Sequence, residues 1–194
     1  MLILNIIVKR GVLTNDELND FLRIFHQLKE KSIDPRYGFD DDWDIFIKKI
    51  LALSPKSYGT KIQNRIIEKN NLVHVKANED LGDFKIENQY FEIKTSLITV
   101  TNKSANITGI RPWQNVNGYY VFIIDANDYN KITTYTFRFT NEEMKKELVT
   151  LKAIPVNGTK KANKENTKSA LRFGISLKSD NFRRWQKKLF VCNY

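Results

Sequence analysis

Residues 82–96 read GDFKIENQYFEIKTS and contain two short runs in which apolar and polar side chains alternate. Phe84 and Ile86 are the apolar side chains of the first run, and Phe91 and Ile93 are those of the second. Such alternation is typical of β-strands with one buried face, so the two runs predict a hairpin with a tight turn between them. Because the apolar side chains must share one face, the prediction pairs Phe84 with Ile93 and Ile86 with Phe91.

This pairing places Asp83 opposite Lys94 and diagonal to Glu92, so that two carboxylates and one ammonium group meet on neighbouring strands. Two close carboxylates are suitable ligands for Mg²⁺, which acidifies an attacking water and neutralises charge on a phosphoryl group. A lysine beside them can orient that water, assist its deprotonation or stabilise the transition state. The three residues therefore predict phosphodiester hydrolysis, with the carboxylates as metal ligands and all three as catalytic residues.

The local pattern alone is weak. An acidic residue stands two positions before a lysine at three places: Asp83 and Lys85, Glu92 and Lys94, Glu143 and Lys145. Only the middle pair follows another acid on a paired strand, whereas the last pair lies on a predicted helix, where positions two apart diverge. The alternative interpretation is the ordinary solvated face of an edge hairpin.

Helices are expected before the hairpin. A capping box at Thr14 and Glu17 opens a helix over about residues 15–30. A second helix follows the acidic turn Asp40–Asp42, whose carboxylates favour a helix start. A third helix is expected over residues 58–69.

Strands and helices follow in the rest of the chain. Strands are expected over residues 72–76, 84–86, 90–98, 119–125, 132–139 and 171–177. Helices are expected over residues 111–116, 141–149 and 182–190. The order between residues 58 and 125 predicts an α/β fold with a mixed central β-sheet flanked by helices. A length of 194 residues suits one domain, with a helical part over 1–56, a core over 57–150 and a basic part over 151–194.

The positive charge is concentrated at the C-terminal end. The chain carries a formal net charge of +10, and residues 152–194 contain 11 basic and 2 acidic residues, which supply +9 of it. Such asymmetry is typical of a protein that binds a polyanion, although a lysine-rich composition without a partner would produce the same count. The basic residues expected to contact phosphates are Lys160, Lys161, Lys164, Arg172, Arg183 and Arg184.

Composition also bounds the class of protein. One cysteine, Cys192, cannot form an internal disulfide, and two histidines are too few for a zinc cage. The apolar run Leu2–Val8 is short, and its positive charges follow it, opposite to a secretory signal. A mean hydropathy of -0.46 excludes an intrinsic membrane protein, so a cytoplasmic protein is expected.

The segment 58–125 resembles the PD-(D/E)XK nuclease superfamily, to which many type II restriction endonucleases belong. The matching residues are Asp83 on one strand and Glu92-Ile93-Lys94 on the next, preceded by a helix and followed by a helix and a strand. The resemblance implies a restriction-endonuclease-like core, with Mg²⁺ (or Mn²⁺ as a substitute) on Asp83 and Glu92 and with Lys94 assisting the water. It also implies double-stranded DNA as substrate and either a homodimer or a partner subunit, because one site per chain must cut two strands.

Four positions near this motif need separate interpretation. Gly82 stands where the proline that names the motif would be. Helical periodicity turns Gln63 inward, where the family often supplies a third acid; this glutamine either orients water at the site or is a satisfied core residue. Arg111 and Gln114 are expected to reach a phosphate or a base edge, unless their segment is simply core and surface.

The sequence therefore predicts a Mg²⁺-dependent type II restriction endonuclease that hydrolyses double-stranded DNA at a specific sequence. Two alternatives stay open. One is a structure-selective nuclease of DNA repair or recombination, and the other is a non-catalytic nucleic-acid-binding module on the same fold.

Overall fold

The structure is a computed structural model, and it describes residues 14, 16–17, 19–20, 22–23, 34, 36–51, 53, 55–76, 80–128, 130–156, 169–192 and 194. The chain divides into two compact units, Met1–Phe39 and Asp40–Tyr194. In the first unit, the described positions among residues 16–23 are helical, and Thr14 and Glu17 form the reciprocal hydrogen bonds of the predicted capping box. The rest of the helix expected over 15–30 lies outside the described residues.

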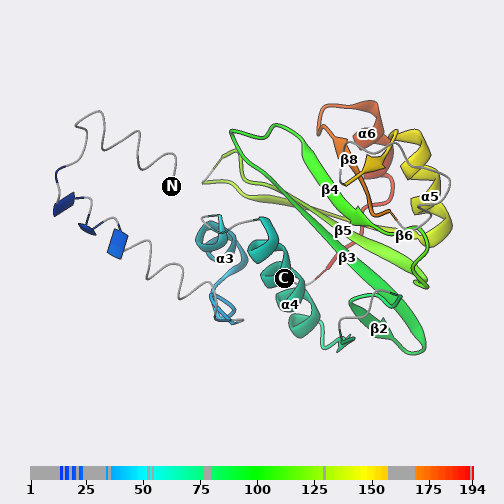
Figure 1. Cartoon of the computed structure of the whole chain (residues 1–194), viewed down its shortest axis with the longest axis horizontal. Helices are drawn as coiled ribbons and strands as arrows, with labels where there is room; N and C mark the ends of the chain where they lie inside the picture. Colours follow the sequence, from blue (N-terminus) through cyan, green and yellow to red (C-terminus); the bar gives the residue numbers. More distant parts are fainter. Residues whose placement is uncertain are drawn as a thin grey trace. The chain divides into compact units, whose positions relative to one another are not determined.

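The second unit is a mixed α/β fold built around a five-stranded sheet (Figure 1). The strand order is β1 (Val73–His74), β2 (Phe84–Ile86), β3 (Gln89–Ile98), β5 (Gly118–Asp125) and β6 (Thr133–Thr140). Only β3 and β5 run parallel, and the other neighbours are antiparallel, so the predicted mixed sheet is confirmed.

A smaller antiparallel sheet packs on one face of the large sheet. It consists of β4 (Ala105–Ile110), β8 (Leu171–Ile175) and β7 (Ile154–Pro155), in that order. Two helices, α5 (Asn141–Thr150) and α6 (Asp180–Gln186), complete this side. The side chains that share the resulting core include Ile98, Ile107, Val121, Phe137, Phe173 and Trp185.

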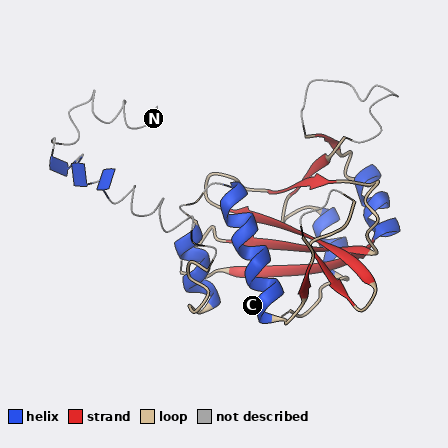
Figure 2. Cartoon of the chain, turned by 60° about the horizontal axis from the view of Figure 1, so that its bottom comes forward, coloured by secondary structure: helices blue, strands red, loops and turns tan. Residues whose placement is uncertain are grey.

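Two further helices belong to the same unit: α3 (Trp43–Ile50) and α4 (Pro55–Lys69). The α4 helix runs across the strands (Figure 2) and contacts β3. A Cβ added at Gly59 would lie 3.4 Å from Oγ1 of Thr95, which shows how closely the helix approaches the strand. Among the described residues, no helix is long and apolar enough to cross a membrane.

The predicted hairpin register is wrong by two residues. Phe84 pairs with Phe91 and Ile86 pairs with Gln89, which leaves a two-residue turn with Glu87 at a φ of 53°. A turn of this length determines the register directly, whereas a two-residue shift keeps all apolar side chains on the same face and so escapes the polarity argument.

The expected helix over 111–116 is also wrong, because those residues form a turn. The connection from β3 to β5 instead contains β4, which was not predicted, and β7 was missed as well. The alternating pattern Ala-Asn-Ile-Thr over 105–108 was a usable strand signal for β4. The remaining strands and helices lie close to the predicted ranges.

Candidate active site

Asp83 stands just before β2, where the chain comes very close to β3. Its Oδ2 accepts a hydrogen bond of 2.7 Å from the backbone N–H of Ile93, and its carboxylate accepts another from the side chain of Gln63 on α4. The preceding residue has no room for a side chain, because a Cβ at Gly82 would lie 2.2 Å from the carbonyl oxygen of Phe91. The absence of a side chain at Gly82 therefore permits this close approach.

Glu92 lies on β3 with 6% of its surface exposed. Its Oε1 lies 2.5 Å from Nζ of Lys94, and its Oε2 lies 3.5 Å from Nε2 of Gln114. Its register partner on β5 is Tyr119, whose pKa is raised first by burial and then by the charge of Glu92. Glu92 is therefore a buried carboxylate with a polar neighbour at each oxygen.

Lys94 follows Glu92 by two residues on the same face of β3, and its side chain is 15% exposed. The ammonium group lies under β4, because a Cβ at Gly109 would be 3.7 Å from its Nζ. Gly109 has a φ of 72° and sits where the pairing of β4 with β8 shifts register. A glycine in this bulge gives the lysine room beside the carboxylates.

The Asp83 carboxyl group interacts electrostatically with both Glu92 and Lys94. Burial, followed by the negative charge of Glu92, raises the pKa of Asp83 to about 6. The charge of Lys94 and the hydrogen bonds from Ile93 and Gln63 act in the opposite direction. A buried carboxyl group whose pKa is raised by a neighbouring carboxylate, beside one lysine, belongs to a site that a further cation would stabilise.

Gln114 adds a fourth group that the sequence had assigned to the DNA interface. It is 3% exposed, and its Nε2 lies 3.3 Å from the carbonyl oxygen of Leu81 as well as near Glu92. Its Oε1 is buried and has no hydrogen-bond partner within the part of the chain that the structure describes. An orphaned oxygen beside a carboxylate is costly unless a ligand, a water or a cation satisfies it.

The donors at this site fit a hard divalent cation. They are the carboxylate oxygens of Asp83 and Glu92, with the amides of Gln63 and Gln114 beside them. Oxygen ligands of this kind suit Mg²⁺, which keeps several waters and needs only one or two carboxylates. Within the described residues, no cluster of three or more His, Cys, Asp or Glu side chains is placed to hold a metal, so any cation here relies on two carboxylates.

The other predicted DNA-binding residues that the structure describes lie on separate elements. Arg111 is half-buried in the turn after β4, and its carbonyl oxygen accepts a hydrogen bond from the hydroxyl of Tyr119 at 3.2 Å. Arg172 is exposed on β8. The predicted contacts at Lys160, Lys161 and Lys164 lie outside the described residues.

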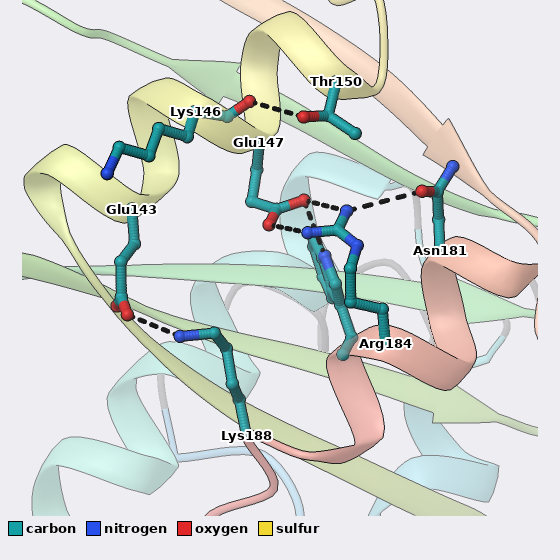
Figure 3. A network of polar contacts seen from close by, with 8 residues as sticks. Glu143, Lys146, Glu147, Thr150, Asn181, Arg184 and Lys188 are labelled. Atoms are coloured by element: carbon teal, nitrogen blue, oxygen red, sulfur yellow. Dashed lines mark hydrogen bonds and ion pairs between the residues drawn. The ribbon is translucent and has the colours of Figure 1, made fainter.

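Arg184 and Arg183 both have acidic partners on this chain. The Arg184 guanidinium forms a two-pronged ion pair with the buried carboxylate of Glu147 on α5, which also accepts a 2.9 Å hydrogen bond from Nε1 of Trp185 (Figure 3). Arg183 pairs with Asp180 at 2.7 Å on the surface of α6. Arg184 thus joins α6 to α5. The sequence, in which Arg184 lies in a basic segment, did not predict this structural role.

A cleft of about 800 Å³ adjoins the three-residue site, and sequence reasoning missed it. Ser96 on β3, two positions after Lys94, lines the cleft. Thr108 on β4, the residue before Gly109, lines it as well. Arg172, from the predicted set, lines the cleft as well. The cleft was not predictable while β4 was unrecognised, because its lining comes from strands of the smaller sheet.

Comparisons with known proteins gave no match. No protein-family model matches the sequence, and no curated protein matches it. What this chain does must therefore be inferred from its own residues.

Proposed function

We propose that this chain is a Mg²⁺-dependent endonuclease of restriction type, which hydrolyses phosphodiester bonds of double-stranded DNA at a specific sequence. The observation that carries the proposal is the convergence of Asp83, Glu92 and Lys94, with Gln63 on the first of them. The resemblance to PD-(D/E)XK nucleases supports it, because helix α4, the hairpin and the parallel strand β5 occur in the order of that core. The position after the lysine strand departs from the family pattern, since β4 replaces the expected helix.

Each side chain has a separate task in this scheme. Asp83 and Glu92 would hold the cation, and the bound cation would supply the charge that acidifies water and neutralises the phosphoryl group. Lys94 donates hydrogen bonds from Nζ to the attacking water or to a phosphate oxygen. Gln63 holds the Asp83 carboxylate, and Gln114 holds that of Glu92. Hydrogen bonds of this kind orient ligand carboxylates.

The test is incubation of plasmid, phage and branched DNA with the protein in the presence of Mg²⁺ or Mn²⁺. Discrete fragments are expected from a restriction enzyme. A smear from any sequence, or cutting only at branches, would instead indicate a nuclease of DNA repair or recombination. DNA that is bound but not cut under all these conditions would indicate a non-catalytic nucleic-acid-binding module.

Two variants link cutting to the proposed residues. Glu92→Gln and Lys94→Met are expected to abolish cleavage while binding in EDTA is retained. Lys85→Met is the matched control, because Lys85 also follows an acid by two positions but lies on β2. Loss of cleavage in the Lys85 variant alone would contradict the assignment of Lys94.

A further inference from the structure

The cleft beside the site is formed by β3 and by the smaller sheet. The backbone N–H of Asn106 on β4 donates a 2.8 Å hydrogen bond to Oγ of Ser96 on β3, which ties the two strands together next to Lys94. The volume of the cleft, about 800 Å³, lies within the range of about 300–1,000 Å³ that is typical of ligand sites. It is thus large enough for part of a substrate whose reacting phosphate lies at Lys94.

The charged residues that the structure describes in the wall of the cleft are both basic. Lys152 and Arg172 line it, and no acidic residue is among the described residues of its wall. Within the described part of the chain, neither basic side chain has an ion-pair partner, in contrast to Arg183 and Arg184 on α6. Two unneutralised cations beside serine, threonine and asparagine side chains form a surface that is suited to a phosphate backbone.

Lys152 occupies an unusual backbone conformation for a lysine. The N–H of Lys152 bonds to the carbonyl of Val149 and that of Ala153 to Leu148, which is a Schellman ending of α5 with Lys152 at a φ of 50°. Helix α4 ends in the same way, but there the left-handed position holds Asn71, which tolerates it. A lysine at this position is strained, and Lys152 lines the cleft. Strained backbone conformations of this kind cluster at functional sites.

Asn106 is the amide best placed to contact a base in the cleft. Asn102, the other amide in the wall, already donates to the carbonyl of Leu97 and accepts from the N–H of Thr99. The side chain of Asn106 is exposed and has no hydrogen-bond partner among the described residues. Opposite it stands Gly174, whose missing side chain leaves that amide uncovered.

We propose that this cleft is the specificity subsite of the enzyme, in which Lys152 and Arg172 contact phosphates of the DNA and Asn106 contacts a base edge. The inference rests on the proposed function and adds to it the surface that selects the sequence. Recognition is thereby assigned to the three-stranded sheet instead of helix α6. Asparagine can bond two atoms of an adenine edge, and arginine and lysine neutralise phosphates without reading sequence.

The first experiment measures the binding of labelled duplex DNA to the full chain in EDTA, over a series of salt concentrations, so that cleavage is not needed. Arg172→Gln and Lys152→Gly are each expected to weaken binding and to reduce the slope of log K against log salt by about 0.9. Lys152→Gly is also expected to raise Tm, because glycine is unstrained at that position. Lys145→Gln is the matched control, because Lys145 is also an exposed basic residue, paired with Glu142 on α5, and it should leave affinity and slope unchanged.

The second experiment selects bound sequences from a randomised DNA library. Asn106→Ala is expected to lose about 5- to 150-fold discrimination at one base pair and to keep the rest of the profile. An unchanged profile and unchanged salt slopes would overturn the inference, as would competition by a free mononucleotide as effective as that by DNA. Failure of the proposed function has a different signature, because the wild type would then bind DNA in these assays and cut none of it when Mg²⁺ or Mn²⁺ is supplied in place of EDTA.

Discussion

Replacing Asp83 with asparagine should stabilise the protein at neutral pH while abolishing cleavage. The Asp83 carboxyl is held in an environment that disfavours its charge, because burial and Glu92 raise its pKa to about 6. Asparagine has nearly the same shape and carries no charge. Its Oδ1 can still accept the hydrogen bond from Ile93, which in the wild type measures 2.7 Å.

The magnitude follows from the shift in the pKa of Asp83 from 3.8 to about 6. At 1.36 kcal/mol per unit, ionising Asp83 in the folded state costs about 3 kcal/mol of stability. Below about pH 4 the folded and unfolded states both hold the proton, so the cost is absent. It grows as the pH rises through the interval from 3.8 to 6 and is constant above it. The advantage of the variant should therefore grow over the same interval, to an upper limit of about 3 kcal/mol.

The assay is urea unfolding of wild type and Asp83→Asn at pH 4, 5, 6 and 7.5. Asp128→Asn, in an exposed turn, is the control for replacing an aspartate at the surface. Adding Mg²⁺ at pH 7.5 should raise the Tm of the wild type and not that of Asp83→Asn, because a ligand stabilises only the state that binds it. A stability gain that is equal at all four pH values, or a variant that is less stable at pH 7.5, would refute this account of Asp83.

Three further substitutions test the packing around the site. Gly82→Ala should lower both the Tm in a thermal melt and the cleavage in a plasmid assay, because the new Cβ would lie 2.2 Å from the carbonyl oxygen of Phe91. A variant with normal Tm and normal cleavage would contradict this prediction. Gly59→Ala, with its Cβ 3.4 Å from Thr95 inside α4, should instead raise stability by about 0.5–1 kcal/mol in urea unfolding, and a loss would show that the helix cannot absorb the contact. Glu147→Ala should cost about 1–3 kcal/mol by the same measurement, because it leaves the buried Nε1 of Trp185 without its acceptor. A cost below about 1 kcal/mol would show that this contact does not hold α6 to α5.

Much of the candidate site was predictable because its residues are close together in sequence. Asp83, Glu92 and Lys94 lie within twelve positions on one hairpin, and strand alternation is enough to place the latter two on one face. Helical periodicity turned Gln63 inward, and its hydrogen bond to Asp83 agrees with the interpretation of a residue at the site.

Long-range contacts were not predictable in the same way. Gln114 looked like an interface residue, and only folding brings it to Glu92, 22 positions away. Arg184 looked like a phosphate contact, yet Glu147 lies 37 positions before it and takes both of its terminal nitrogens. Composition can count charges along a chain, but the partner of each charge depends on how distant elements pack.

By itself, the sequence determined the class of fold, the apolar face of the hairpin and the identity of the two carboxylates and the lysine, because these depend on periodicity over a few residues. Tertiary structure decided the register of the hairpin, through a two-residue turn. The alternation of apolar and polar residues does not distinguish registers that differ by two residues. It also decided the cleft, since Arg172 and Asn106 face one cavity only after β8 has paired with β4 across more than sixty positions of chain. Local patterns reflect the geometry of a single element, whereas a binding surface is made where separate elements meet.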